Sequence, residues 1–276
     1  MMYGIIFRGK HSYDIGNIIV KTKSRPPIAP VKQLDEEIPY KDGNVDYSDS
    51  GGRLFYQDKV IEIDFTFIAK DLIRLNQSIT KFVSWMAGGY GELRFDDMPY
   101  TIWYAKPINL NDIEHFAYKN GKFTAQFRCK PFNSWIFNSE GIRLGDAIRL
   151  DSNVPLGFGN ENKFTLSKGV TEHSLFYYGT APVRPTIEIS QYSGDLSITV
   201  NNDTMSTSSI SGSPIVIDCE KRIITRGGLQ CTTVFKGDFF ELQPCDNRII
   251  VIANKASSSN TVEFKYKHKF LYGDDF

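Results

Sequence analysis

The feature that most constrains the fold is an alternation of apolar and polar residues in two segments, 60–67 and 123–129. In residues 60–67, Glu62, Asp64 and Thr66 fall on one face and the intervening apolar side chains on the other. Residues 123–129 repeat the pattern with Phe, Ala, Phe and Cys. A period of two with one polar face is typical of a half-buried antiparallel strand. We therefore expect a mainly β protein.

One helix is predicted between these strands. Asp71 can cap its N-terminus, and Gly88-Gly89 can end it, because glycine tolerates the left-handed conformation that closes many helices. The apolar residues that recur at helical spacing are Leu72, Leu75, Ile79, Phe82, Val83 and Met86. One such helix across a sheet gives an α+β domain, which we place at residues 1–132.

Residues 21–57 do not fit this core, since they are polar and rich in Pro and Gly. So long a stretch inside a compact domain is usually either functional or disordered. Two interpretations stay open on the residues alone: a flexible surface loop, or an extended arm that orders against a neighbouring subunit. If the segment is an arm, the candidate subunit contacts are its apolar and aromatic residues Tyr40, Val45, Tyr47, Leu54, Phe55 and Tyr56.

The second half predicts a β-sandwich. Short β-rich runs separated by Ser, Gly and Asn turns continue from residue 186 to 266, with no amphipathic helix. Many strands at such spacing are typical of a sandwich. We expect residues 133–150 to form a junction, residues 151–276 to form the sandwich, and the Ser-rich run 206–213 to be a loop.

Charge and cysteine content narrow the classes of function. The chain has 32 Lys and Arg against 32 Asp and Glu, whereas sequence-independent nucleic-acid binding needs a cationic excess. We find no secretory signal and no apolar run of membrane-spanning length, so we expect no membrane insertion. The four cysteines show no C-x-x-C pairing, and reduced thiols are favoured over a disulfide framework or a zinc site.

No pattern points to catalysis or to a cofactor. Asp96-Asp97 is the clearest pair of carboxylates, but Asp favours turns, and adjacent side chains point in different directions. The four histidines are scattered without metal-ligand spacing, and no nucleophile elbow or phosphate loop is present. We expect no enzyme, no cofactor and no metal site.

Sugar binding is the alternative function, because β-sandwiches often host lectins. Aromatic side chains supply the platforms on which sugars stack, and the second domain offers Tyr177, Tyr178 and Tyr192 as weak candidates. Tyr177 and Tyr178 are also expected as strand residues, one facing in and one facing out.

Several segments carry a resemblance to a known family. They are residues 3–13 (YGIIFRGKHSY), 38–43 (IPYKDG), 93–106 (LRFDDMPYTIWYAK) and 121–132 (GKFTAQFRCKPF), with looser matches at 179–185 (GTAPVRP), 215–218 (IVID) and 237–244 (GDFFELQP). Together they resemble the distal tail protein (Dit) of long-tailed siphovirus bacteriophages and prophages. One departure is Cys245, which stands where the family tends to carry Gly before the Asn of this turn.

The resemblance implies an assembly role. It implies a homohexameric ring, formed by the N-terminal domain, that docks on the major tail (tube) protein and on the tail-associated protein. It also implies a galectin-like C-terminal sandwich that faces outward and in some phages anchors a receptor-binding protein. The expected location is the virion tail tip, after assembly in the host cytoplasm. For residues 21–57, the resemblance favours the arm.

Overall fold

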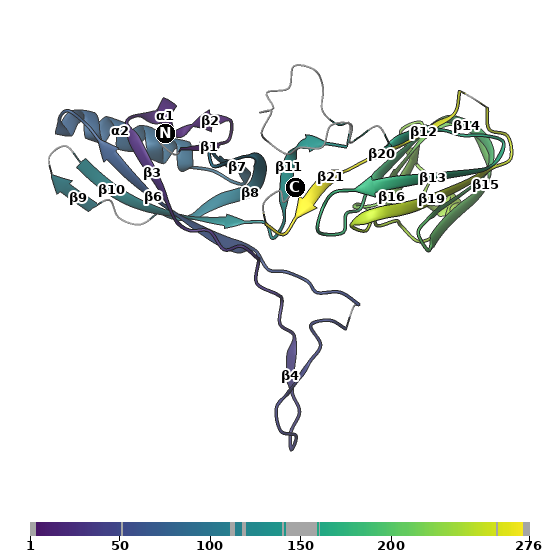
Figure 1. Cartoon of the computed structure of the whole chain (residues 1–276), viewed down its shortest axis with the longest axis horizontal. Coiled ribbons are helices and arrows are strands. Elements are labelled where there is room, and N and C mark those ends of the chain that lie inside the picture. The colour runs from purple at the N-terminus through teal and green to yellow at the C-terminus, as the bar shows by residue number, and fades with distance from the viewer. Residues whose placement is uncertain are drawn as a thin grey trace. The chain divides into compact units, whose positions relative to one another are not determined.

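The computed structural model describes residues 4–50, 52–110, 114–117, 120–139, 141, 159, 161–257 and 259–272 (Figure 1). Two compact units divide the chain: Met1–Ser134 with Leu271–Asp274, and Trp135–Phe270. Most of the predicted junction 133–150 lies outside the described residues, but its first part is a strand, β11 (Asn133–Asn138).

The first unit is built on an antiparallel sheet with the strand order β2-β1-β7-β8-β10-β6-β3. Its strands are β1 (Ile5–Phe7), β2 (Lys10–His11), β3 (Ile18–Ser24), β6 (Lys59–Ile68), β7 (Gly91–Phe95), β8 (Met98–Leu110) and β10 (Asn120–Cys129), with β9 (Glu114–Ala117) beside β10. The two segments predicted from their alternation are β6 and β10. They pair directly, Phe65 opposite Phe123 and Ile61 opposite Phe127, so the two predicted apolar faces form one surface.

The predicted helix is α2 (Leu72–Met86). Asp71 Oδ1 accepts a hydrogen bond from Arg74 N at 2.8 Å, as expected of the N-cap, and Gly88 follows the C-terminus at a φ of +120°. A short helix, α1 (Ser12–Ile15), was not predicted. Its N-cap is His11, whose ring Nδ1 accepts a hydrogen bond from Tyr13 N at 3.1 Å.

Aromatic packing joins α2 to the sheet. The ring of Phe82 lies 4.7 Å from Phe65, 5.3 Å from Phe67 and 5.1 Å from Phe123, each measured between centroids and in edge-on geometry. Such edge-on aromatic pairs are favoured beyond the area they bury. Figure 1 shows α2 lying along one face of this sheet.

The polar segment of the first unit begins later than predicted. Residues 21–24 belong to β3, which pairs with β6. Beyond it, β4 (Asp35–Glu37) and β5 (Asn44–Asp46) form a separate two-stranded sheet. Figure 1 shows β4 in a long projection that leaves the first unit between β3 and β6.

The second unit is a β-sandwich, as predicted. Its strands are β12 (Lys163–Thr165), β13 (Gly169–Tyr177), β14 (Thr186–Val200), β15 (Asp203–Asp218), β16 (Ile223–Arg226), β17 (Leu229–Gln230), β18 (Lys236–Gly237), β19 (Cys245–Ala253) and β20 (Thr261–Lys265), with a 3-10 turn, η1 (Thr232–Val234). The last strand, β21 (Lys267–Phe270), pairs with β11. Its core is aliphatic and aromatic, centred on β14, β15 and β19.

One long hairpin, β14–β15, builds both layers of the sandwich. The first half of β14, from Thr186 to Ile189, pairs with β20, whereas its second half, from Leu196 to Val200, pairs with β19. The register between β14 and β15 shifts between the two halves, where Gly194 takes a φ of +135°. The expectation of a loop at 206–213 is therefore wrong, because these residues lie within β15.

Candidate functional site: an extended arm

The segment that stands apart from both cores is residues 30–57, which we call the arm. Backbone hydrogen bonds tie its two sides together along its length. Gln57 N donates to Pro30 O at 2.7 Å, Lys32 N to Phe55 O at 2.7 Å, and Tyr47 N to Leu34 O at 2.8 Å. Farther out, β4 and β5 continue the pairing. The segment is therefore a two-stranded ribbon and not a structureless loop.

The predicted contact residues fall into two groups. Tyr40 is fully exposed, with a relative accessibility of 110%, at the turn between β4 and β5, where its φ is +67°. Tyr47, Leu54 and Phe55 are also exposed, and Val45 is half-buried. Tyr56 instead anchors the base of the arm. It forms a bridge with Val31, and its ring packs edge-on against Phe132 at 5.6 Å.

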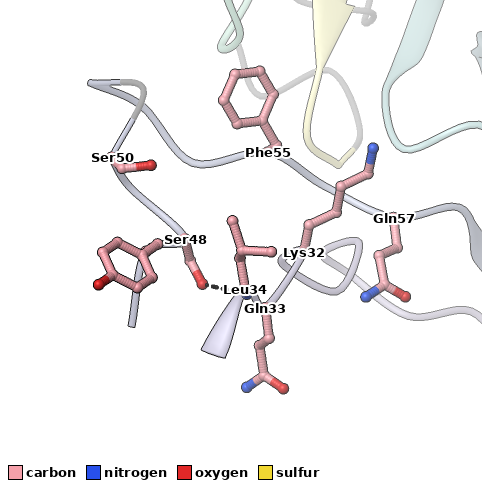
Figure 2. A pocket seen from close by; sticks show the side chains of 8 residues that line it. Lys32, Gln33, Leu34, Ser48, Ser50, Phe55 and Gln57 are labelled. Carbon is pink, nitrogen blue, oxygen red and sulfur yellow. Dashed lines mark hydrogen bonds between the residues drawn. The ribbon is translucent and has the colours of Figure 1, made fainter. Parts of the chain in front are cut away.

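An open pocket of about 570 Å³ lies along the arm (Figure 2). It is lined by Lys32, Gln33, Leu34, Tyr47, Ser48, Ser50, Phe55 and Gln57. Ser48 Oγ accepts a hydrogen bond from Leu34 N at 3.0 Å, which holds the two sides of the pocket together. Leu34 is 62% exposed and was missed by the sequence analysis. Leu34 is a single apolar residue next to three acidic ones, and this local pattern does not indicate a contact surface.

The outer part of the arm is acidic. Its carboxylates are Asp35, Glu36, Glu37, Asp42, Asp46 and Asp49, and Lys41 is the one basic residue between Gln33 and Gly52. In the part of the chain that the structure describes, none of these acids forms an ion pair. Asp35 lies directly opposite Asp46 in the ribbon, and like charges in that position repel each other.

Asp96 and Asp97 form the turn between β7 and β8, as predicted, and both also hold neighbouring segments. Asp96 Oδ2 accepts from Gly4 N at 2.8 Å, and Asp96 Oδ1 lies 3.1 Å from His11 Nε2. Both terminal nitrogens of Arg25 donate hydrogen bonds to the Asp97 carboxylate, at 3.2 and 2.8 Å. The Arg25 guanidinium also lies 4.9 Å from the centroid of the Phe95 ring. These carboxylates therefore fix the N-terminal strand and the segment that follows β3.

Two buried titratable groups face each other across β6 and β10. Lys59 pairs in register with Cys129, and the Lys59 ammonium donates to Leu271 O at 3.4 Å. Burial lowers the pKa of Lys59 to about 8 and raises the pKa of the Cys129 thiol to about 12. The thiolate is the nucleophilic form of cysteine, so Cys129 is an inert core thiol, in line with the expected role of free cysteines in this chain.

Two of the three tyrosines considered for sugar contact lie in the core. Tyr177 is 0% exposed, and its hydroxyl donates to Ala181 O at 2.9 Å. Tyr192 is also buried, with its hydroxyl donating to Asp195 O at 2.7 Å. Tyr178 is half-buried. Stacking on a sugar requires an open ring face, so the burial of Tyr177 and Tyr192 counts against this prediction, which stays untested by binding.

Cys245, which stands where the family tends to carry Gly, adopts a backbone conformation that favours glycine. Cys245 takes a φ of +72°, a conformation that glycine adopts freely and other residues rarely do. The next residue but one, Asn247, is buried, and its amide donates to Gln243 O at 2.8 Å and to Cys245 O at 3.0 Å. The Asn247 amide therefore holds the turn in which Cys245 takes this conformation.

Two further observations concern the described residues only. They contain no cluster of three or more His, Cys, Asp or Glu side chains that could hold a metal ion. None of the helices found in these ranges is long and apolar enough to cross a membrane.

Comparison with known proteins gives a consistent result for both units. Residues 10–129 match the family model of the phage tail protein RIFT-related domain, and residues 178–270 match that of the siphovirus-type tail component, C-terminal domain. No curated protein sequence matches. Among solved structures, the chain is similar to the Dit protein of phage SPP1, described as a paradigm of the hub adsorption apparatus in phages that infect Gram-positive bacteria. That similarity has a TM-score of 0.64 and 14% identity, and it covers 97% of this chain and 99% of the other. The chain belongs to the distal tail protein (Dit) family of siphovirus-type phages, which are structural components of the phage tail.

Proposed function

We propose that six copies of this protein close a ring at the tail tip, with the arm as the main contact between neighbours. The ring would join the last ring of the tail tube to the tail-associated protein. The second unit, for which we propose a galectin-like fold, would face outward and carry the host-adhesion device. The observation that carries this proposal is the arm, an ordered ribbon with exposed apolar side chains.

The arm gathers several exposed apolar and aromatic side chains on one short ribbon. Leu34, Tyr40 and Leu54 are all largely open to solvent, and burying one such side chain is worth about 1.5–3 kcal/mol. A two-stranded hairpin alone is also marginally stable in water. A neighbouring subunit that covers these side chains would add the apolar burial that the arm lacks within its own unit.

The geometry of the contact favours a ring. An arm that reaches from one subunit onto a different surface of the next makes a heterologous contact, and such contacts close into a ring when the rotation between subunits is right. A self-complementary pair of arms would instead stop at a dimer. Particle mass therefore separates the two arrangements.

The test is mass photometry and negative-stain imaging of the full-length protein over a range of concentrations, alone and with the tail-associated protein. We expect six-fold rings. Deleting residues 40–52 removes the tip of the arm and β5 but keeps the pairing of Lys32 with Phe55, so the variant should remain folded by circular dichroism and be monomeric. Val170→Ser is the matched control, since Val170 is exposed in the second unit.

Rings that persist after the deletion would remove the arm from the contact. Wild-type protein that stays monomeric under all conditions would overturn the hexamer. In that case, specific retention of the full chain on a glycan array would favour the alternative function, a carbohydrate-binding adhesin.

A further inference from the structure

The sheet of the first unit has two different faces. The face that packs on α2 is apolar, whereas the opposite face, formed by β3, β6, β10 and the C-terminal part of β8, carries exposed side chains. Its exposed apolar residues are Ile19, Val60, Ile68 and Tyr104. We call this surface the open face.

The open face carries cations that lack an acidic partner. Its carboxylates are already engaged. Asp64 lies 3.3 Å from Lys122 Nζ, and Glu62 Oε1 accepts from Gln126 Nε2 at 2.6 Å. Within the described residues, Lys106 and Arg128 form no ion pair.

Lys106 and Arg128 also lie directly opposite each other in the register of β8 and β10. Like charges in that position destabilise a sheet. Lys106 gains some compensation from the ring of Tyr90, whose centroid lies 5.2 Å from the ammonium. Lys21, on the same face of β3 and opposite Asp64, is exposed and adds further positive charge. A negatively charged partner would relieve this repulsion.

The arm carries the complementary arrangement. Asp35 opposes Asp46 across the ribbon as Lys106 opposes Arg128 across the sheet. Exposed apolar residues also accompany the charges on both surfaces, Ile38 and Tyr40 on the arm and Val60 and Tyr104 on the open face. Complementary potentials of this kind set the orientation of two partners and exclude wrong ones.

We infer that the acidic outer part of the arm docks on the open face of a second copy of this chain. This inference rests on the proposed ring and specifies where each arm binds its neighbour. The occupant is a neighbouring copy because the chain as a whole is neutral, with 32 Lys and Arg against 32 Asp and Glu, so its acidic arm leaves the matching excess of positive charge on its other surfaces. The continuous backbone pairing from Pro30 to Glu37 also holds the arm extended.

A charge-exchange experiment tests this docking. The arm variant is Asp35→Lys with Asp46→Lys, and the face variant is Lys106→Glu with Arg128→Glu. We expect each to weaken ring formation by about tenfold or more in the assembly midpoint, and the chain that carries all four changes to recover rings. Lys168→Glu, an exposed site in the second unit, is the control for a change in charge.

The outcomes separate this inference from the proposed ring. Rings that form equally well in both charge variants would overturn the docking face and leave the hexamer standing. Wild-type protein without rings would overturn both.

A second measurement uses the wild-type chain and needs no variant to fold. Carbodiimide couples a lysine to a carboxylate only when the two are in contact. In a mixture of isotopically light and heavy copies, we expect Lys21 or Lys106 of one copy joined to residues 35–37 of the other. Crosslinks to these acids that fall only on other lysines would contradict the docking face. Rings should also dissociate more readily as salt rises from about 50 to 500 mM, because salt screens exposed charges.

Discussion

His268 gives the sharpest prediction about stability, because it is a titratable ring enclosed by aromatic side chains. It is 1% exposed in β21. Its ring centroid lies 5.3 Å from that of Trp135, 5.4 Å from that of Tyr177 and 5.3 Å from that of Tyr266. Burial lowers the pKa of His268 from 6.5 to about 4. The folded protein therefore holds this ring neutral at pH values where an exposed histidine is charged.

The sign of the effect follows from proton linkage. Between pH 6.5 and about 4 the unfolded chain binds a proton at His268 that the folded chain does not, so stability falls as the pH falls. A shift from 6.5 to about 4 corresponds to a loss of about 3 kcal/mol at the acid end and about 2 kcal/mol at pH 5. At pH 7 the same group costs almost nothing, because it is neutral in both states.

The test compares the full chain with His268→Phe by urea unfolding at pH 7 and pH 5, followed by tryptophan fluorescence. Acidification should cost the wild type about 2 kcal/mol more than the variant, because Phe cannot take up a proton. Phe270→Leu is the matched control, since it alters a neutral neighbour in the same cluster and should change stability equally at both pH values. If the wild type and His268→Phe lost the same stability between pH 7 and pH 5, the buried neutral histidine would not be the source of acid sensitivity.

Three further substitutions test other parts of the fold. Cys245→Gly should stabilise the protein by about 1 kcal/mol, because Cys245 has a φ of +72° that costs a non-glycine residue about that much; a lower urea midpoint would refute this. Asp71→Ala should cost about 1 kcal/mol, since it removes the 2.8 Å cap bond to Arg74 N, whereas Asp71→Asn should retain most of the stability in the same assay. Arg25→Lys should lower the melting temperature, because an ammonium cannot reproduce the two hydrogen bonds of Arg25 to Asp97. An unchanged melting temperature would show that this ion pair contributes nothing measurable to stability.

The sequence determined those features that depend on local pattern. Alternation in residues 60–67 and 123–129 decided which face of β6 and β10 is apolar, because side chains along a strand point to opposite sides. Asp71 and the glycines after Met86 fixed the ends of α2 through hydrogen bonding and backbone freedom that belong to those residues alone. The polar composition of residues 21–57 likewise marked the segment that leaves the core, although its start was misplaced by the strand that ends at Ser24.

Tertiary structure decided what the local pattern leaves open. The Ser-rich run 206–213 was predicted to be a loop, yet it lies within β15, which pairs with β14 on both sides of a register shift. Pairing with a neighbouring strand therefore outweighs the weak intrinsic preference of Ser-rich segments for strand structure. Tyr177 and Tyr192 were weak candidates for sugar contact, but both side chains are buried in the folded chain. An aromatic residue in a strand can face either side, and only the layer packed above it determines which side is buried.

On the charged surfaces too, the sequence determines which residues are present and the tertiary structure determines which of them are neighbours. The acidic residues of the arm and the basic residues of β8 and β10 can be read from the sequence. Their spacing along the chain does not determine which of them lie opposite each other across paired strands. Strand register placed Asp35 opposite Asp46 and Lys106 opposite Arg128. Register depends on pairing between distant segments, so the repulsion that makes each surface suited to an oppositely charged partner exists only in the folded chain.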